Sequence, residues 1–128
     1  MIKHTLASLV IGLSLLMGAT TGAWAADYLE GIKAAQRGDY VAALQQWRPL
    51  AEQGLPIAQK ALGEMYYDGR GVLQNHVMAH MWFNVAASNG YEFASLYRDR
   101  LAKLMTAADI SKAQQLAIEC VARNYKGC

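Results

Sequence analysis

Hydrophobic and polar residues alternate with a helical period in the middle of the chain. Between positions 58 and 67, apolar side chains recur every three or four residues, and polar ones fall between them. At roughly 100° per residue, the apolar positions share one arc of a helix. They are Ala58, Ala61, Leu62, Met65 and Tyr66. The remaining residues are expected to point away from that arc: Gln59, Lys60, Gly63, Glu64 and Tyr67.

A second helical arc follows a glycine-rich loop. Gly69 can adopt the left-handed conformation that ends a helix, and Asn75 is a good N-cap for the next one. Small residues on facing helices allow close approach, and aromatic side chains fill the remaining space. The second arc has this composition, with Ala79, Trp82, Phe83 and Ala86. The pattern therefore predicts a close-packed helix–loop–helix unit.

The same unit has an upstream copy. Five identities occur at one offset of 36 positions: Val41, Ala43, Ala51, Gly54 and Ala58 match Val77, Ala79, Ala87, Gly90 and Ala94. At this offset Trp47 also falls on Phe83, one aromatic residue on another. Internal periods of this length are the signature of solenoid proteins. Residues 28–54 are accordingly predicted to form a helix, a tight turn at 37–39 and a second helix.

The last predicted helix begins at a capping sequence. Thr106 and Asp109 resemble a capping box, with aspartate in place of the usual glutamate or glutamine. The helix is expected to cover the exposed end of the solenoid with one apolar stripe. That stripe contains Ile110, Ala113, Ala117, Ile118 and Val121, and Cys120 borders it.

The central unit resembles the Sel1-like repeat family, a relative of the tetratricopeptide repeats. The residues that carry this resemblance are Ala58, Leu62, Gly63, Met65, Tyr66, Gly69, Gly71, Val72, Asn75, Ala79, Trp82, Phe83, Ala86, Ala87, Gly90 and Ala94. The resemblance implies an all-α, right-handed α-solenoid of helix pairs with a C-terminal capping helix. Downstream, Arg98 and Asp99 replace the family's Leu-Gly. Terminal repeats are usually atypical because one face meets water.

These patterns divide the chain into segments. Residues 1–25 read as a signal peptide, and 26–128 form the repeat domain. Within it we expect a degenerate repeat at about 28–54, a full repeat at about 55–90, terminal helices at about 91–123 and a tail at 124–128.

The signal peptide is predicted from three features in order. A basic start at Lys3 precedes an uncharged apolar run from Leu6 to Gly18, and Ala23-Trp24-Ala25 is a small-x-small cleavage site. A retained membrane anchor is the alternative, but the run is short for a span of about 20 residues. We therefore expect export, periplasmic or secreted, with a cut after Ala25 and no stable membrane insertion afterwards.

Charge and cysteine content refine this picture. The formal net charge is +2 and becomes +1 when Lys3 leaves, which offers no electrostatic basis for nucleic-acid binding. Cys120 and Cys128 are the two cysteines, and an even number in an exported chain favours a disulfide. Eight helical residues span about 12 Å, whereas a disulfide joins Cα atoms roughly 4.4–6.8 Å apart. The tail must therefore fold back, and Asn124 and Gly127 suit that turn; two free thiols are the alternative.

Local motifs for catalysis or cofactors are weak. His76 and His80 have the i, i+4 spacing of zinc-binding helices, but Val77 stands where the motif has its glutamate. A lone Gly69-Arg70-Gly71 lacks the lysine of a phosphate loop. We predict no catalytic residue, no metal ligand and no cofactor.

The resemblance implies a protein-interaction module or an accessory or regulatory subunit that binds a protein or peptide. One alternative is an enzyme-like role, because some cysteine-rich Sel1-like proteins bind or hydrolyse β-lactams. This chain lacks their cysteine pattern. A structural envelope factor is the other alternative. Aromatic residues are enriched in binding hot spots, so the expected partner surface is the first-helix face around Lys60, Glu64, Tyr67 and Tyr97.

Overall fold

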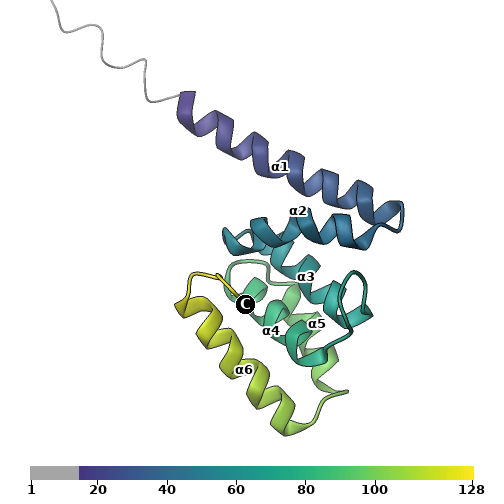
Figure 1. Cartoon of the computed structure of the whole chain (residues 1–128). Coiled ribbons are helices and arrows are strands. Elements are labelled where there is room, and N and C mark those ends of the chain that lie inside the picture. Colours follow the sequence, from purple (N-terminus) through teal and green to yellow (C-terminus); the bar gives the residue numbers. More distant parts are fainter. Residues whose placement is uncertain (1–14) are drawn as a thin grey trace, which may run out of the picture.

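The computed structural model describes residues 15–128, with side chains from residue 23 onward, and this part of the chain is all-helical (Figure 1). The helices are α1 (Leu15–Gln36), α2 (Tyr40–Glu52), α3 (Pro56–Asp68), α4 (His76–Ser88), α5 (Ala94–Ala102) and α6 (Ala107–Ala122). No strand occurs within residues 15–128. The predicted turn at 37–39 lies between α1 and α2.

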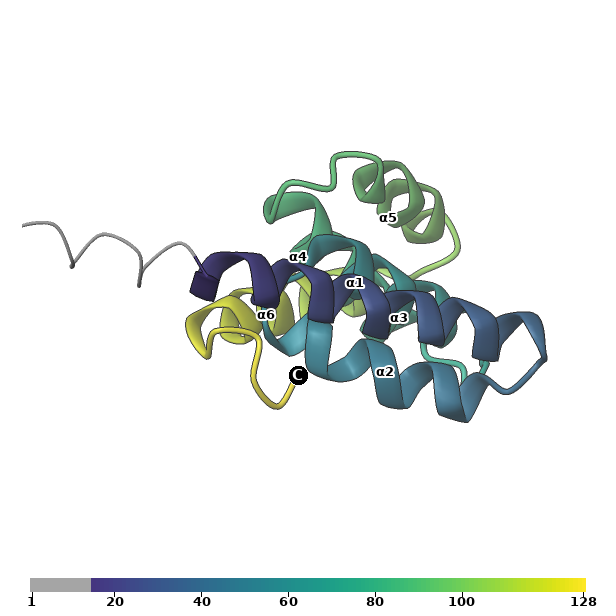
Figure 2. The same ribbon diagram turned by 90° about the horizontal axis from the view of Figure 1, so that it is seen from above.

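The helices stack in chain order as an α-solenoid. Contacts connect α1 with α2, α2 with α3, and α3 with α4. Both α5 and α6 then pack against α4 rather than chiefly against each other, and Figure 2 shows them on different sides of it. The all-α solenoid class is confirmed, and α6 closes it by covering one side of α4.

The helix ends follow local sequence signals. Gly69 adopts a left-handed conformation with φ 69° and closes α3. The Asn75 side chain accepts a hydrogen bond from the Met78 amide at 3.1 Å, and Thr106 accepts one from Asp109 at 3.1 Å. These predicted caps are confirmed, and each depends on residues no more than four positions apart.

Two equivalent turns support the internal repeat. After α2, the Leu55 amide donates to the Leu50 carbonyl at 3.0 Å; after α4, Tyr91 donates to Ala86 at 3.0 Å. Both turns pass through a glycine with positive φ, Gly54 in the first and Gly90 in the second. The offset of 36 positions in sequence therefore corresponds to the same backbone geometry in space.

The core contains both predicted arcs, but α3 is buried more widely than its pattern indicated. Gln59 is 0% exposed and Gly63 is buried, although both were expected to point away. The reason is that α3 packs against α2 on one side and α4 on the other. Gln59 remains hydrogen-bonded there, because its Nε2 donates to the Ala51 carbonyl at 3.0 Å.

The predicted stripe of α6 is partly wrong. Ala113 and Ala117 are buried as expected, whereas Ile118 is 65% and Val121 is 45% exposed. Cys120, placed at the border of the stripe, is 0% exposed. Because α6 packs mainly against one helix, α4, only a narrow arc of it is covered.

The tail folds back as predicted and carries the disulfide. Cys120 and Cys128 are joined, with their Cα atoms 5.5 Å apart. Asn124 (φ 52°) and Gly127 (φ 67°) make the reversal, together with Tyr125 (φ 66°). Lys126 Nζ then donates to the Glu52 carbonyl at 2.9 Å, so the tail reaches the end of α2.

Helix α1 runs through the predicted cleavage site. The basic start and the first part of the apolar run, residues 1–14, lie outside the described residues. Trp24 is 39% exposed, and Gly31, which follows the expected cut, is the first buried residue among positions 23–128. In the part of the chain that the structure covers, no helix combines the length and apolar character needed to cross a membrane.

Candidate functional site

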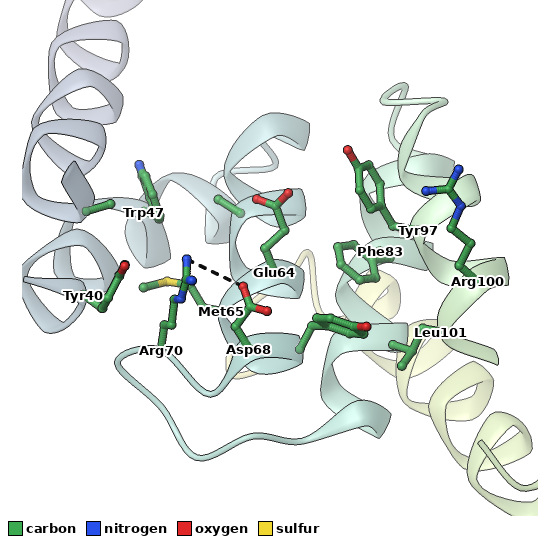
Figure 3. A pocket seen from close by; sticks show the side chains of 13 residues that line it. Tyr40, Trp47, Glu64, Met65, Asp68, Arg70, Phe83, Tyr97, Arg100 and Leu101 are labelled. Atoms are coloured by element: carbon green, nitrogen blue, oxygen red, sulfur yellow. Dashed lines mark ion pairs between the residues drawn. The ribbon is translucent and has the colours of Figure 1, made fainter. Parts of the chain in front are cut away.

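A groove of about 530 Å³ opens beside α3, and Figure 3 shows its side chains. Such a volume lies within the ~300–1,000 Å³ range of ligand-binding clefts. Every helix from α1 to α5 contributes to the lining, which consists of Ala35, Tyr40, Trp47, Ala61, Glu64, Met65, Tyr67, Asp68, Arg70, Phe83, Tyr97, Arg100 and Leu101. The site is thus built by the stacking of several helices.

The floor of the groove is apolar and well packed. Trp47, Met65, Phe83 and Leu101 are at most 8% exposed. The Phe83 ring stacks against Tyr97, with ring centroids 5.6 Å apart. This contact connects the core of α4 with α5, so the floor is held by helices rather than by a loop.

Charged residues form the rim in two units of similar composition. Lys60 pairs with Glu64 at 2.6 Å and lies over the Tyr97 ring, 5.3 Å from its centroid. Arg70 lies over Tyr40 at 5.1 Å and pairs with Asp68 at 3.8 Å, the dashed line in Figure 3. Each unit therefore contains one cation, one carboxylate and one aromatic ring.

The protonation of Lys60 reflects its surroundings. Partial burial alone lowers the pKa of its ammonium group, but the hydrogen bond and charge of Glu64, together with Tyr91 and Tyr97, outweigh this effect. The pKa of Lys60 is therefore held above its usual value. Lys60 stays charged at neutral pH and keeps Glu64 paired.

The structure brings three of the four residues of the expected partner surface into one groove. Glu64, Tyr67 and Tyr97 line it, whereas Lys60 is absent from the lining and contacts it through Glu64 and Tyr97. Tyr67 is 39% and Tyr97 is 40% exposed. Tyr67 also stacks on His76, with centroids 5.6 Å apart.

The lining also contains aromatic and cationic residues outside the expected partner surface, namely Tyr40, Trp47, Phe83, Arg70 and Arg100. Trp47, which the repeat offset aligns with Phe83, is 8% exposed and belongs to the core. Arg70 lies in the loop after α3 and Arg100 in the atypical α5. No local pattern distinguished Arg100 from an ordinary surface residue, because its place in the groove depends on the packing of α5.

The two histidines of α4 occupy different environments. His80 is 3% exposed, and its Nδ1 has no hydrogen-bond partner among the described residues. Burial and the nearby Arg98 guanidinium lower the pKa of His80, so its imidazole is neutral at pH 7. His76 lies at the start of the helix against Tyr67. Residues 15–128 contain no cluster of three side chains suited to a metal ion.

Comparison with known families identifies the central unit. Residues 56–91 match the model of the Sel1 repeat. This range covers α3, the glycine-rich loop and α4, which are the elements at the base of the groove.

A solved structure has a similar fold. It is the crystal structure of c5321, described as a protective antigen present in uropathogenic Escherichia coli strains displaying an SLR fold. The two chains are 33% identical, with a TM-score of 0.72 over 84% of this chain. The present chain spans 24% of the length of that protein. Among curated proteins, no sequence matches the chain.

Proposed function

We propose that this chain, a Sel1-like repeat protein, is an exported protein-interaction module that binds a polypeptide segment in the groove beside α3. Sel1-like repeats are an interaction type of repeat and are generally non-catalytic. The single observation that carries the proposal is the open groove of about 530 Å³ with an aromatic floor and a charged rim. We assign the chain the role of an accessory or regulatory subunit.

The composition of the groove suits polypeptide binding. Interface hot spots are enriched in tyrosine, tryptophan and arginine, and tyrosine offers a large contact area at low entropic cost. The lining contains Tyr40, Tyr67 and Tyr97, together with Trp47. Tyr67 and Tyr97 are partly exposed, so they are accessible to a partner before any rearrangement.

Export is supported by two features. The disulfide between Cys120 and Cys128 is consistent with an oxidising compartment. Among positions 23–128, the residues of α1 that pack against the core start at Tyr28, so removal of residues 1–25 would leave them in place. We place the mature protein in the periplasm or outside the cell.

The test starts with a pull-down from envelope extract, followed by titration calorimetry with the purified partner. Tyr67→Ala should weaken binding about tenfold or more, as expected for an interface hot spot. Lys60→Ala and Glu64→Ala should weaken it less, because their ion pair is partly exposed. Ile118→Ala is the matched control, since Ile118 is exposed on α6 outside the groove.

One result would contradict the groove as the site. If all three groove variants bind the partner with wild-type affinity, the partner uses another surface. The loop from Arg70 to Asn75 is then the next candidate, because Leu73 within it is 91% exposed.

A further inference from the structure

The charged side chains of the groove differ in whether they already have a partner. Glu64 is paired with Lys60 at 2.6 Å, and Asp68 is paired with Arg70 at 3.8 Å. Arg100 also lines the groove, but its side chain makes no ion pair or hydrogen bond with any of residues 23–128. One guanidinium group is therefore available to a ligand.

The local charge has the same sign as this free group. The charged residues that line the groove balance, with Arg70 and Arg100 against Glu64 and Asp68. Lys60, which lies beside the lining and pairs with Glu64, adds one positive charge. The guanidinium group is always charged, and its planar fork matches a carboxylate with two parallel hydrogen bonds. The groove is consequently complementary to a ligand that carries a carboxylate.

The apolar floor of the groove adds a second requirement for the ligand. Arg100 lies one position before the buried Leu101, and both line the groove together with Tyr97. Figure 3 shows the Arg100 side chain next to that of Tyr97. A carboxylate bound at Arg100 therefore lies next to the apolar part of the groove. A neighbouring apolar side chain of the ligand can bury its surface there, where it gains roughly 25 cal/mol per Å².

We infer that the groove selects a polypeptide segment in which a bulky apolar side chain stands beside an acidic residue, with Arg100 binding the carboxylate. This inference rests on the proposed function and specifies the chemistry of the partner. A basic segment fits less well because it would have to displace Lys60 or Arg70 from the α3 carboxylates. It would also bring a further positive charge close to Arg100.

The experiment uses three short peptides with blocked ends and a neutral dye. The first has phenylalanine between two aspartates and glycine at both ends, so an acidic residue stands beside the phenylalanine in either chain direction. The second has lysines for the aspartates, and the third has alanine for phenylalanine. Binding to the oxidised mature protein is measured by fluorescence anisotropy at low and high ionic strength.

The first peptide should bind, and both replacements should weaken binding about tenfold or more. Higher ionic strength should weaken it further, since the contact is partly exposed. Arg100→Gln should lower the affinity about tenfold, whereas Arg123→Gln should leave it unchanged. Arg123 is an exposed arginine at the end of α6, outside the groove. Melting curves of both variants check that the fold is retained.

Several results would overturn the inference. They are equal or tighter binding of the lysine peptide, an unchanged affinity in Arg100→Gln, or no binding of any of the three peptides.

Failure of the proposed function gives different results. If Tyr67→Ala, Lys60→Ala and Glu64→Ala all leave partner binding unchanged, the groove itself is not the site. If Tyr67→Ala weakens partner binding but Arg100→Gln does not, the groove is used and only the acidic preference is wrong.

Discussion

The Phe83 ring lies directly on the backbone of Gly63: a Cβ atom at Gly63 would come 2.5 Å from Phe83 Cδ1. The preceding helix pair contains the same arrangement, because a Cβ atom at Gly31 would come 2.2 Å from Trp47 Nε1. In both pairs, a glycine of the first helix lets an aromatic residue of the second approach closely. Both aromatic residues then line the groove.

Gly63→Ala should therefore destabilise the protein by about 1–3 kcal/mol, the usual cost of overpacking a core. This outcome opposes the gain of roughly 0.5–1 kcal/mol that alanine normally brings to a helix interior. Phe83 is 1% exposed and stacked on Tyr97, so its ring has little room to move away. Urea unfolding measures the change.

A double-mutant cycle with Phe83→Leu provides the control for Gly63→Ala. If the clash is the cause, the Gly63→Ala penalty should shrink when the ring is absent, since residues in contact couple by about 0.5–3 kcal/mol. Additive effects of the two changes would show that the penalty arises elsewhere.

Ala86→Leu should also destabilise the fold by about 1–3 kcal/mol. Ala86 is 0% exposed on α4, so the added side-chain atoms have no free space. Ala108→Leu is the matched control, because Ala108 is exposed near the start of α6. Thermal unfolding of both variants makes the comparison, and equal melting temperatures for Ala86→Leu and the wild type would contradict the assigned packing.

The disulfide should form after export and add stability without a chemical role. The loop between Cys120 and Cys128 is short, so the gain should lie near the low end of the usual ~2–4 kcal/mol. Thiol titration of protein purified without reductant should find no free cysteine. The variant Cys120→Ala with Cys128→Ser should unfold at lower urea but bind a partner normally once folded; weaker binding by the folded variant would instead assign the tail a functional role.

The mature chain should start at Ala26. Intact-mass measurement of protein recovered from the envelope tests this prediction directly. Replacing both small residues of the cleavage site, Ala23→Leu with Ala25→Leu, should block processing and increase the mass by that of the retained segment. A mature wild-type chain that still contains Leu6 to Gly18 would mean a membrane-anchored protein.

Stability should fall in mild acid because of His80. Its folded-state pKa lies below the ordinary value of 6.5, chiefly through burial and also through Arg98, with Asp99 opposing the shift in part. The unfolded chain therefore binds the proton first as the pH drops. The contribution of neutral, buried His80 to the free energy of unfolding is complete above about pH 6.5. Below that pH it decreases by at most about 1.4 kcal/mol per pH unit.

Urea unfolding between pH 7.5 and pH 5 measures the effect of His80. His80→Leu should flatten the pH dependence, and its apolar side chain leaves no imidazole nitrogen unpaired in the core. His76→Leu retains His80 and serves as the matched control on the same helix. An identical slope in wild type and His80→Leu would exclude His80 as the cause.

Local sequence determined where the helices of this protein begin and end. Asn75, Thr106 and Gly69 act on backbone groups within a few positions, so their roles could be predicted without knowledge of any neighbour. The reversal of the tail between Cys120 and Cys128 was also predictable, because eight residues of a continuous helix span more than the distance that a disulfide allows. The repeat register was also readable, because small and aromatic residues recur at one offset.

Tertiary structure alone decided which faces are covered and what meets at the groove. Periodicity marks one apolar arc, but α3 has neighbours on two sides, and this buries Gln59 and Gly63. Helix α6 has one main neighbour, and this leaves Ile118 exposed. Arg100 joins Trp47 in one groove through the stacking of helices far apart in sequence. Burial and proximity of this kind depend on the neighbours that each helix acquires, and a helix's own sequence does not specify them.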